Sequence, residues 1–393
     1  MIRAAMLARC LVGAAGAAAV GARSTPRRFA SRDVTQKIGI LGVPFDKGQT
    51  DQGVSAGPGA IRGAGLVEAL RSLGHDVQDF GDVSYDSVPD LVGPENMDKY
   101  QHVAVCMREV SSLARRIQSE GRICLALGGD HSVTIGTVDA TVNAHEDVAV
   151  IWVDAHADLN TPATSPSGSA HGMPVALLAK DLADYWPYLP GMDWQVPKLP
   201  LSNLAYIGLR SVDEYERLTM EKFNICAFGM QDVESLGITG TVELALRHVD
   251  PYKRRAIHLS FDIDALDALE APSTGTPGLQ AAGLQAAGLQ AWQHVYHSGG
   301  AGSVAVRGGL TLREGIHIME KVHETGRLAA VDLVEVNPAL GSARDVSTTL
   351  QAALQLLVAA FGHSRLGNMP RAQELPLTKG ATLSAKGAKG KDV

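Results

Sequence analysis

The sequence is poor in cysteine, in excess positive charge and in long hydrophobic runs. Its four cysteines are scattered among 393 residues and form no Cys-x-x-Cys pair, which argues against a disulfide framework and against a zinc site built from thiolates. The formal net charge of -7 gives no electrostatic case for a nucleic-acid partner. Beyond the N-terminal segment no apolar run approaches the roughly 20 residues that a membrane-spanning helix needs, so no membrane insertion is expected.

Acidic residues are missing from the N-terminal segment. Residues 1–32 contain six arginines, no lysine and no acid, and the first acid is Asp33. A leader rich in arginine and free of acids is typical of a mitochondrial transit peptide, so residues 1–32 are predicted to be one, with a matrix location for the mature protein. The apolar stretch 11–20 leaves a secretory signal peptide as an alternative. A third alternative is a disordered N-terminal extension that carries no targeting signal.

Short runs rich in valine, isoleucine and leucine recur along the body of the chain and alternate with segments typical of helices. This alternation predicts an α/β fold with a mainly parallel sheet and helices on both faces. A helix is predicted over 61–73, with Gly74 as its stop. In such sheets ligands bind beyond the C-terminal ends of the strands. The predicted strands are 38–43, 123–127, 148–153, 204–208, 225–228, 257–261 and 329–334.

Residues 37–366 are predicted to form one domain, with two atypical segments. After Pro277 the pentapeptide Gly-Leu-Gln-Ala-Ala occurs twice, and a third, varied copy leads into a Gly/Ser/His stretch that ends at Arg307. A glycine every five residues costs a helix about 1 kcal/mol each relative to alanine, so 278–307 is predicted to be an irregular inserted loop. Residues 367–393 have little apolar content and are predicted to be a flexible tail.

Three short clusters of aspartate and histidine each follow an apolar run. Because alternate residues of an extended chain point to the same side, the members of a cluster that lie two apart are expected to face together. Six oxygen and nitrogen donors at strand ends indicate a site rather than a solvated surface. The clusters are Gly128-Gly129-Asp130-His131, Asp154-Ala155-His156-Ala157-Asp158 and Asp262-Ile263-Asp264.

These donors suit a pair of divalent ions. A dinuclear hydrolytic centre needs bridging carboxylates, and Asp154 and Asp262 each open a cluster at a strand end. His131 and His156 would supply nitrogen, and Asp158 and Asp264 would complete the two coordination shells. Oxygen-rich donors with imidazole suit manganese, iron, nickel or zinc, and the ions would acidify a water molecule into a nucleophile. Taken singly, each cluster is more often a cap or a turn, but three together favour the metal site.

Two further residues have chemical reasons to belong to this site. Glu335 follows the apolar strand 329–334 and has no lysine or arginine beside it in sequence, so its carboxylate needs a positive partner. A substrate guanidinium would supply charge and paired donors, whereas an internal salt bridge is the alternative. His171 lies in a loop rich in Pro, Ser and Gly, where a near-neutral pKa suits proton shuttling; a merely exposed histidine is the alternative.

The clusters resemble the ureohydrolase family, and within it the arginases. The resemblance extends to Ser167-Gly168-Ser169-Ala170-His171-Gly172, Ser260-Phe261-Asp262-Ile263-Asp264 and Val334-Glu335-Val336-Asn337-Pro338, and covers roughly residues 37–366. With its leader the chain is most similar to the mitochondrial type II arginases. The resemblance implies a three-layer α/β/α fold of the arginase/deacetylase type, two Mn²⁺ per subunit, a homotrimer, and hydrolysis of L-arginine to L-ornithine and urea through a metal-bridging hydroxide.

The resemblance also assigns roles to individual residues. One ion would be held by His131, Asp154, Asp158 and Asp262, and the other by Asp154, His156, Asp262 and Asp264. Asp158 would orient the nucleophile and pass a proton to the leaving amine, His171 would relay protons to solvent, and Glu335 would bind the guanidinium group. The substrate-binding residues that the resemblance implies are His156, Asn160, Ser167, Ser169, Asp213, Glu216, Thr276 and Glu335.

Departures from the family pattern keep other functions open. Ser169 stands where arginases usually carry Asn, and the 278–307 segment interrupts the family sequence directly after Thr276-Pro277. Agmatinase or another guanidino hydrolase is the runner-up, although residues that match carboxylate contacts favour arginine. A metal-dependent deacetylase is a more distant alternative, and Glu335 and Asn160 disfavour it. A protein of another class, which kept the fold and lost turnover through the insertion, is the last.

Overall fold

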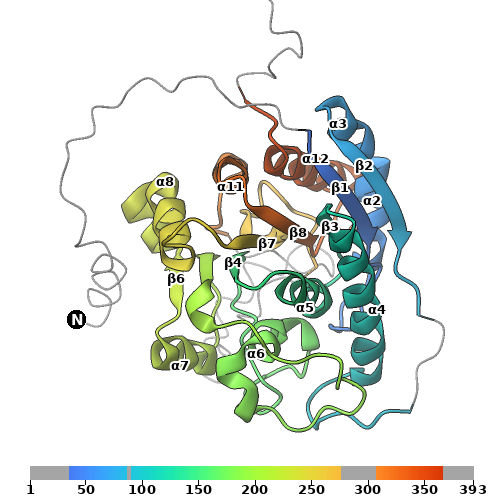
Figure 1. Cartoon of the computed structure of the whole chain (residues 1–393), viewed down its shortest axis with the longest axis vertical. Coiled ribbons are helices and arrows are strands. Elements are labelled where there is room, and N and C mark those ends of the chain that lie inside the picture. The colour runs from blue at the N-terminus through green and yellow to red at the C-terminus, as the bar shows by residue number, and fades with distance from the viewer. Residues whose placement is uncertain (1–34, 86–89, 276–306, 366–393) are drawn as a thin grey trace, which may run out of the picture.

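The computed structural model describes residues 35–85, 90–275 and 307–365. The predicted transit peptide, the 278–307 insertion apart from Arg307, the tail from residue 367 and Thr276 all lie outside these residues. Within them the chain folds around one sheet of eight parallel strands. Figure 1 shows this sheet with helices around it. In spatial order the strands are β2 (Asp76–Asp82), β1 (Lys37–Gly42), β3 (Ile123–Leu127), β8 (Leu328–Val334), β7 (Ala256–Asp262), β4 (Val148–Val153), β5 (Leu204–Leu209) and β6 (Cys226–Gly229).

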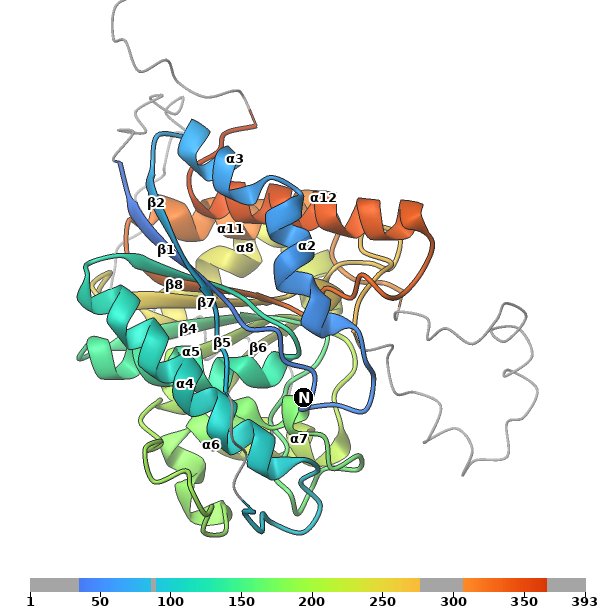
Figure 2. The same cartoon turned by 90° about the vertical axis from the view of Figure 1, so that its right-hand side faces the viewer.

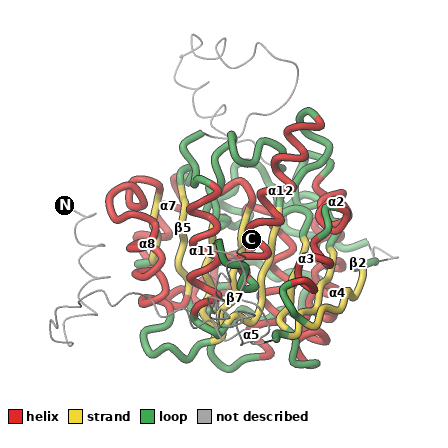
Figure 3. The backbone as a smooth tube through the Cα atoms, turned by 90° about the horizontal axis from the view of Figure 1, so that it is seen from above, coloured by secondary structure: helices red, strands yellow, loops and turns green. Residues whose placement is uncertain are grey.

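Helices cover both faces of the sheet, which makes the three layers that the sequence predicts (Figures 2 and 3). The strands alternate their apolar side chains between the two faces, and each face packs against a separate group of helices. One layer contains α2 (Gly57–Gly63), α3 (Leu66–Ser72), α8 (Met230–Val249), α11 (Leu312–Glu324) and α12 (Ala343–Ala360). The other contains α4 (Tyr100–Ser119), α5 (Thr134–Ala144), α6 (Pro174–Leu178) and α7 (Glu214–Phe223).

Two local predictions need correction. The helix predicted over 61–73 is two helices, because Gly65 adopts a left-handed φ of 93° between α2 and α3. Its predicted stop at Gly74 is confirmed by a φ of 96° there. Strand β2 was missed because it is a polar edge strand in which only Val77 is buried, so it has none of the apolar run that marks the central strands.

Strand order explains why the polar clusters meet. The four strands β3, β8, β7 and β4 are neighbours at the centre of the sheet, although 200 residues of chain separate β3 from β8. Since all strands are parallel, their C-terminal ends lie at one edge, where open α/β sheets bind ligands. No helix of the described residues is long and apolar enough to cross a membrane.

Candidate metal and substrate site

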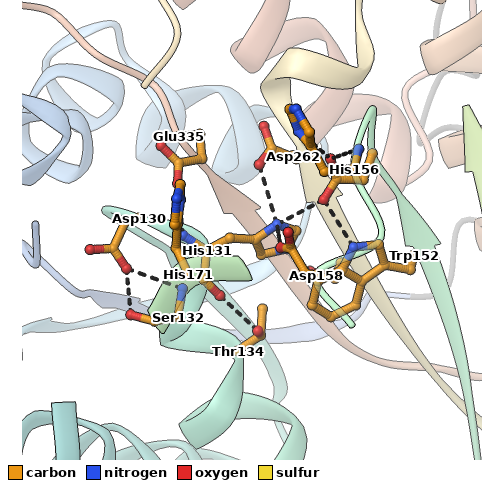
Figure 4. Close-up of polar contacts among 12 residues, drawn as sticks. Asp130, His131, Ser132, Thr134, Trp152, His156, Asp158, His171, Asp262 and Glu335 are labelled. Atoms are coloured by element: carbon orange, nitrogen blue, oxygen red, sulfur yellow. Dashed lines mark hydrogen bonds and ion pairs between the residues drawn. The ribbon is translucent and has the colours of Figure 1, made fainter. Parts of the chain in front are cut away.

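Polar residues follow each of the four central strands. His131 comes shortly after β3, Asp154 directly follows β4, Asp262 ends β7, and Glu335 directly follows β8. Figure 4 shows the side chains of His131, Asp262 and Glu335 close together, with His156 and Asp158 from the loop after β4 beside them. The prediction that the three clusters lie at strand ends and converge is therefore confirmed by the coordinates.

A tight turn opens each cluster, and the chain does not stay extended. In each turn an aspartate Oδ1 accepts the backbone N–H two residues later, which is an Asx turn. Asp158 adopts a φ of 49°, in the left-handed region. The prediction that cluster members share one side of an extended strand is thus wrong, because the donors converge through turns. The turns are Asp130 to Ser132 (3.1 Å), Asp154 to His156 (2.7 Å) and Asp262 to Asp264 (2.8 Å).

The first donor group surrounds the His131 ring. Its Nδ1 lies 3.0 Å from Asp154 Oδ2, 3.0 Å from Asp158 Oδ2 and 3.2 Å from Asp262 Oδ2. Its other nitrogen, Nε2, is 2.9 Å from Ser260 Oγ, and the ring stacks on Trp152 with centroids 4.2 Å apart. The imidazole is therefore fixed on both sides, and Nδ1 points into a ring of carboxylate oxygens.

The second donor group shares Asp154 with the first. His156 Nδ1 lies 3.1 Å from Asp264 Oδ2 and 3.5 Å from Asp154 Oδ1. Asp154 thus offers one oxygen to each group, as a bridging carboxylate would. In each group the donor atoms all lie within 4.8 Å of one another, and by this measure Asp262 belongs only to the first group. The His156 side chain is 23% exposed, so the second group is more open to solvent than the first.

Unpartnered nitrogens show that these donors fit cations. Within the described residues, His131 Nδ1 and His156 Nε2 are buried without a hydrogen bond, although three oxygens surround the former. Adjacent donors around an octahedral ion with bonds of about 2.1 Å stand about 3 Å apart, close to the spacing found at His131. A divalent ion between the donors of the first group would supply the partner that His131 Nδ1 lacks and would neutralise the clustered carboxylates, whereas His156 faces its oxygens with Nδ1 rather than with the unpartnered Nε2.

Burial and mutual interaction shift the pKa values of the ionisable groups in this cluster. Burial, reinforced by Asp154, raises the pKa of Asp158 to about 6, and burial with the neighbouring carboxylates raises the pKa of Asp262 well above its usual range. Burial alone would lower the pKa of His131, but Asp154, Asp158 and Asp262 raise it well above its ordinary value. Such mutual shifts are typical of ligands that are collected for an ion.

Glu335 is buried beside the first donor group. Its Oε1 accepts the backbone N–H of His131 at 2.9 Å and lies 3.2 Å from His171 Nδ1, and its Oε2 accepts from Gln49 at 3.1 Å. In the described residues no lysine or arginine nitrogen comes within 4.0 Å of this carboxylate, but His171 pairs with it at 3.2 Å, so the alternative of an internal salt bridge is met by a histidine when that ring is protonated. Gly275 packs so closely that an added Cβ would lie 1.8 Å from Oε2.

His171 belongs to a short 3-10 helix, η3 (Ala170–Gly172), that caps the site. Its side chain is 16% exposed and contacts Glu335, which places it between the buried carboxylate and solvent. Burial alone would lower the pKa of His171, but Glu335 and other nearby carboxylates raise it above its ordinary value. This histidine is therefore not a freely exposed loop side chain.

Known proteins resemble the chain over most of its length. The family model described as arginase family matches residues 36–297 and 297–362. The chain belongs to the arginase family. It is 41% identical to the mitochondrial arginase-2 of Rattus norvegicus, over 86% of this chain and 88% of that protein, and 39% identical to the hepatic arginase of Aquarana catesbeiana, over 86% and 96%. The crystal structure of arginase from Bacillus caldovelox superposes with a TM-score of 0.70 at 33% identity, covering 84% of this chain and all of that one.

The arginase family is metal-dependent, and this member keeps both donor groups. The structure also shows how the polar residues beyond the metal donors contact one another. Asn160 Nδ2 donates to Asp213 Oδ2 at 2.9 Å, and Thr164 Oγ1 donates to Asn160 Oδ1 at 2.9 Å. Asp213 also begins α7 with a capping box, so its side chain serves as a helix cap as well.

Glu216 joins the loop after β4 to the start of α7. Its two oxygens accept the backbone N–H groups of Leu159 and Asp213, each at 2.9 Å. Burial raises the pKa of Glu216 to about 8. The side chain is 4% exposed and holds the loop after β4 against α7, and its contact with substrate stays a prediction.

The residues of the 165–169 turn have mixed exposure in this arginase-family protein. Ser167 is exposed and its Oγ accepts the N–H of Ser169 at 3.2 Å, whereas Ser169 is buried. Asn96 holds this turn by donating to the carbonyls of Pro162 and Ser165 at 2.9 Å and 2.8 Å. Substrate contacts by Ser167 and Ser169 stay predictions, and so does the contact by Thr276.

Sequence reasoning gave no role to several supporting residues. Trp152 Nε1 donates to Asp154 Oδ2 at 2.9 Å, and Ser260 contacts His131. Each lies two positions before a cluster aspartate on its strand, so the two-residue period of strands could have found both. Gln49 carried no such signal, because it lies in an irregular loop whose position only the fold determines.

Proposed function

We propose that this protein is an arginase, which hydrolyses the guanidinium group of L-arginine to give L-ornithine and urea. One observation carries the proposal: a buried carboxylate without a described lysine or arginine partner, Glu335, lies beside two donor groups that share Asp154. A planar guanidinium cation supplies the charge and paired donors that such a carboxylate requires. Family membership supports the same conclusion.

We propose two Mn²⁺ ions per subunit, which Asp154 and Asp262 would hold jointly. His131 and Asp158 would complete one set of ligands, and His156 and Asp264 would complete the other. When bound, the ions lower the pKa of a water molecule toward neutrality and so supply the nucleophile. The oxygen-rich donor set with two imidazoles supports manganese, and iron, nickel and zinc are tested beside it by metal analysis and reconstitution of the stripped protein.

The protein's own residues orient the substrate and move protons. Glu335 holds the guanidinium with its carbon toward the donor groups, since its Oε1 is tied to the His131 backbone. Asp158 stands among the donors and passes a proton to the leaving amine. His171, in contact with Glu335 and partly exposed, relays protons to solvent.

The amino-acid end of arginine would meet the residues after β4. We assign its carboxylate to Asn160, Ser167 and Ser169, and its ammonium to Asp213, with Glu216 and His156 nearby and Thr276 lining the guanidinium pocket. The pairing of Asn160 with Asp213 supports this, because one amide and one carboxylate side by side match a zwitterion. A decarboxylated substrate would not use the amide.

Urea release decides between these functions. Purified full-length protein loaded with Mn²⁺ is incubated with L-arginine and, separately, with agmatine. An arginase releases urea from L-arginine in large excess over agmatine. Urea from agmatine alone would identify an agmatinase, and no urea from either compound would overturn the proposal.

We also propose that residues 278–307 are a dispensable insertion in the catalytic domain 37–366. The described chain on either side is anchored separately: Gly275 N donates to Glu335 O at 2.8 Å, whereas Gly308 N donates to Asp267 Oδ2 at 2.7 Å. Replacing the insertion by a short linker should keep or improve turnover. A large loss of urea production would show that the segment is needed.

Location and assembly complete the proposal. The arginine-rich leader and the similarity to rat mitochondrial arginase-2 support import into the mitochondrial matrix. Imaging of the chain with and without residues 1–32 tests it, and matrix entry of the truncated chain would refute it. We propose a homotrimer by family membership alone, and light scattering on the purified protein measures its mass.

A further inference from the structure

The loop that follows β1 is fixed over the site at residues 48 and 49. Gly48 N donates to Asp130 Oδ2 at 2.7 Å, and Gly48 O accepts the N–H of His171 at 3.0 Å. Gln49 O accepts from Lys99 Nζ at 3.0 Å. A Cβ on Gly48 would lie 2.6 Å from Asp130 Oδ1, so no larger residue fits without a shift. These contacts fix the backbone from which the Gln49 side chain extends.

The Gln49 side chain is buried and reaches the guanidinium-binding carboxylate. It is 4% exposed, and its Nε2 donates to Glu335 Oε2 at 3.1 Å. The other oxygen, Oε1, is already held by the His131 backbone and lies close to the His171 ring. Gln49 therefore supplies the side-chain donor that fixes Oε2 and, with it, the plane of the carboxylate.

A neutral amide is the chemically important feature of this contact. A lysine or arginine in its place would orient Glu335 but would also cancel the charge that a cationic substrate needs. The nearby lysine, Lys99, instead donates to the backbone carbonyl of Gln49. Gln49 thus holds Oε2 in place without adding a positive charge, and the contact with His171 involves the other oxygen, Oε1.

We propose that Gln49 is a positioning residue for guanidinium recognition: it orients Glu335 without neutralising it. This inference rests on the proposed hydrolysis of arginine and deepens it. If Gln49 served only to pack the loop, its replacement would weaken every ligand of the site alike. If it positions Glu335, its replacement weakens only ligands with a cationic guanidinium end.

Two substitutions separate these roles. Gln49→Leu removes the donor at similar volume, and Gln49→Glu keeps the shape but places a second carboxylate against Glu335. Gln52→Leu is the matched control, because Gln52 is exposed in the same loop. All variants are loaded with Mn²⁺, and bound metal and melting temperature are recorded for each.

The ligands are L-arginine and L-2-aminopentanoate, which keeps the amino-acid end and lacks the guanidinium. Urea release gives KM and kcat for arginine, with KM as its apparent affinity, and calorimetry measures the affinity for L-2-aminopentanoate. A protein that releases no urea is titrated with arginine by calorimetry as well. A lost hydrogen bond to a buried charge corresponds to about a tenfold to hundredfold change in affinity. Gln49→Leu should therefore weaken the binding of arginine about tenfold, and Gln49→Glu should weaken it about a hundredfold. The affinity for L-2-aminopentanoate and the Gln52→Leu control should change less than about twofold.

Each outcome decides the matter. Equal weakening of both ligands, or unchanged arginine affinity in Gln49→Leu, overturns the inference. If Gln49→Leu fails to fold, the ratio of the two affinities in the isosteric Gln49→Glu variant decides in the same way. If the unmodified protein releases no urea, the proposed function fails, whereas the calorimetric ratio still tests whether Gln49 governs guanidinium binding.

Discussion

The metal-donor groups and the loop of residues 159–172 lie side by side but are built differently. The donor groups follow central strands directly, and two of their histidine nitrogens lack a hydrogen bond within the described chain. In the loop, by contrast, the polar side chains already satisfy one another, as Asn160 does with Asp213 and Thr164. The first region needs an ion to complete it, and the second is complete by itself.

This difference ranks the expected effects of substitution. Removing a donor from the metal groups leaves buried charges that nothing else in the described structure compensates, so the loss is large. Removing a loop contact exchanges one hydrogen bond for others, because substrate binding there replaces bonds that already exist. The following predictions test this ranking, from the strongest effect to the weakest.

Replacing Asp154 should abolish activity. Because Asp154 belongs to both donor groups, Asp154→Asn should remove bound metal from both and lower kcat/KM about 1000-fold or more. Metal analysis and urea release measure the effect, with the exposed Asp184→Asn as control. Two ions bound with near-normal turnover in Asp154→Asn would disprove the shared-ligand arrangement.

Neutralising Glu335 should leave the metal in place and remove guanidinium binding. Glu335→Gln keeps the shape and loses the charge, so kcat/KM for arginine should fall by about 100- to 1000-fold. Metal content should equal that of the unmodified protein, because Glu335 contacts the backbone of His131 rather than its ring. Loss of metal in this variant would show that Glu335 belongs to the donor groups.

Truncating Asn160 should alter substrate choice more than turnover. Asn160→Ala loses the amide assigned to the carboxylate end, so kcat/KM for arginine should fall about tenfold. The rate with agmatine, which has no carboxylate, should stay the same and acts as an internal control. An equal fall for both substrates would mean that Asn160 only supports the loop through Asp213.

Releasing the loop from its support should have the smallest effect. Asn96 donates to two carbonyls of the loop while adopting a φ of 63°. Asn96→Gly keeps the backbone conformation and loses both bonds, so hydrogen exchange in 159–172 should speed up and KM should rise about threefold. Asn96→Ala adds backbone strain and should also lower the melting temperature. Unchanged exchange in both would locate the support elsewhere.

The strands and the donors could be predicted because both are local in sequence. Val148–Val153 is an unbroken apolar run, and Asp154 follows it directly, so strand and donor were predicted together. The polar edge strand Asp76–Asp82 carried no such signal. The extended geometry predicted for Asp154 to Asp158 was wrong, since the side chain of Asp154 turns its own backbone. That competition between side-chain and backbone hydrogen bonding depends on burial.

Sequence alone determined the sheet, its parallel sense and the identity of the donors, because apolar runs and strand-end residues report local physical preferences. The tertiary structure alone decided how these donors group around Asp154 and which neutral residue contacts Glu335. Those contacts join residues as far apart as Gln49 and Glu335, and they follow from the order of strands in the sheet. Strand order reflects the packing of the whole core, which no single segment encodes.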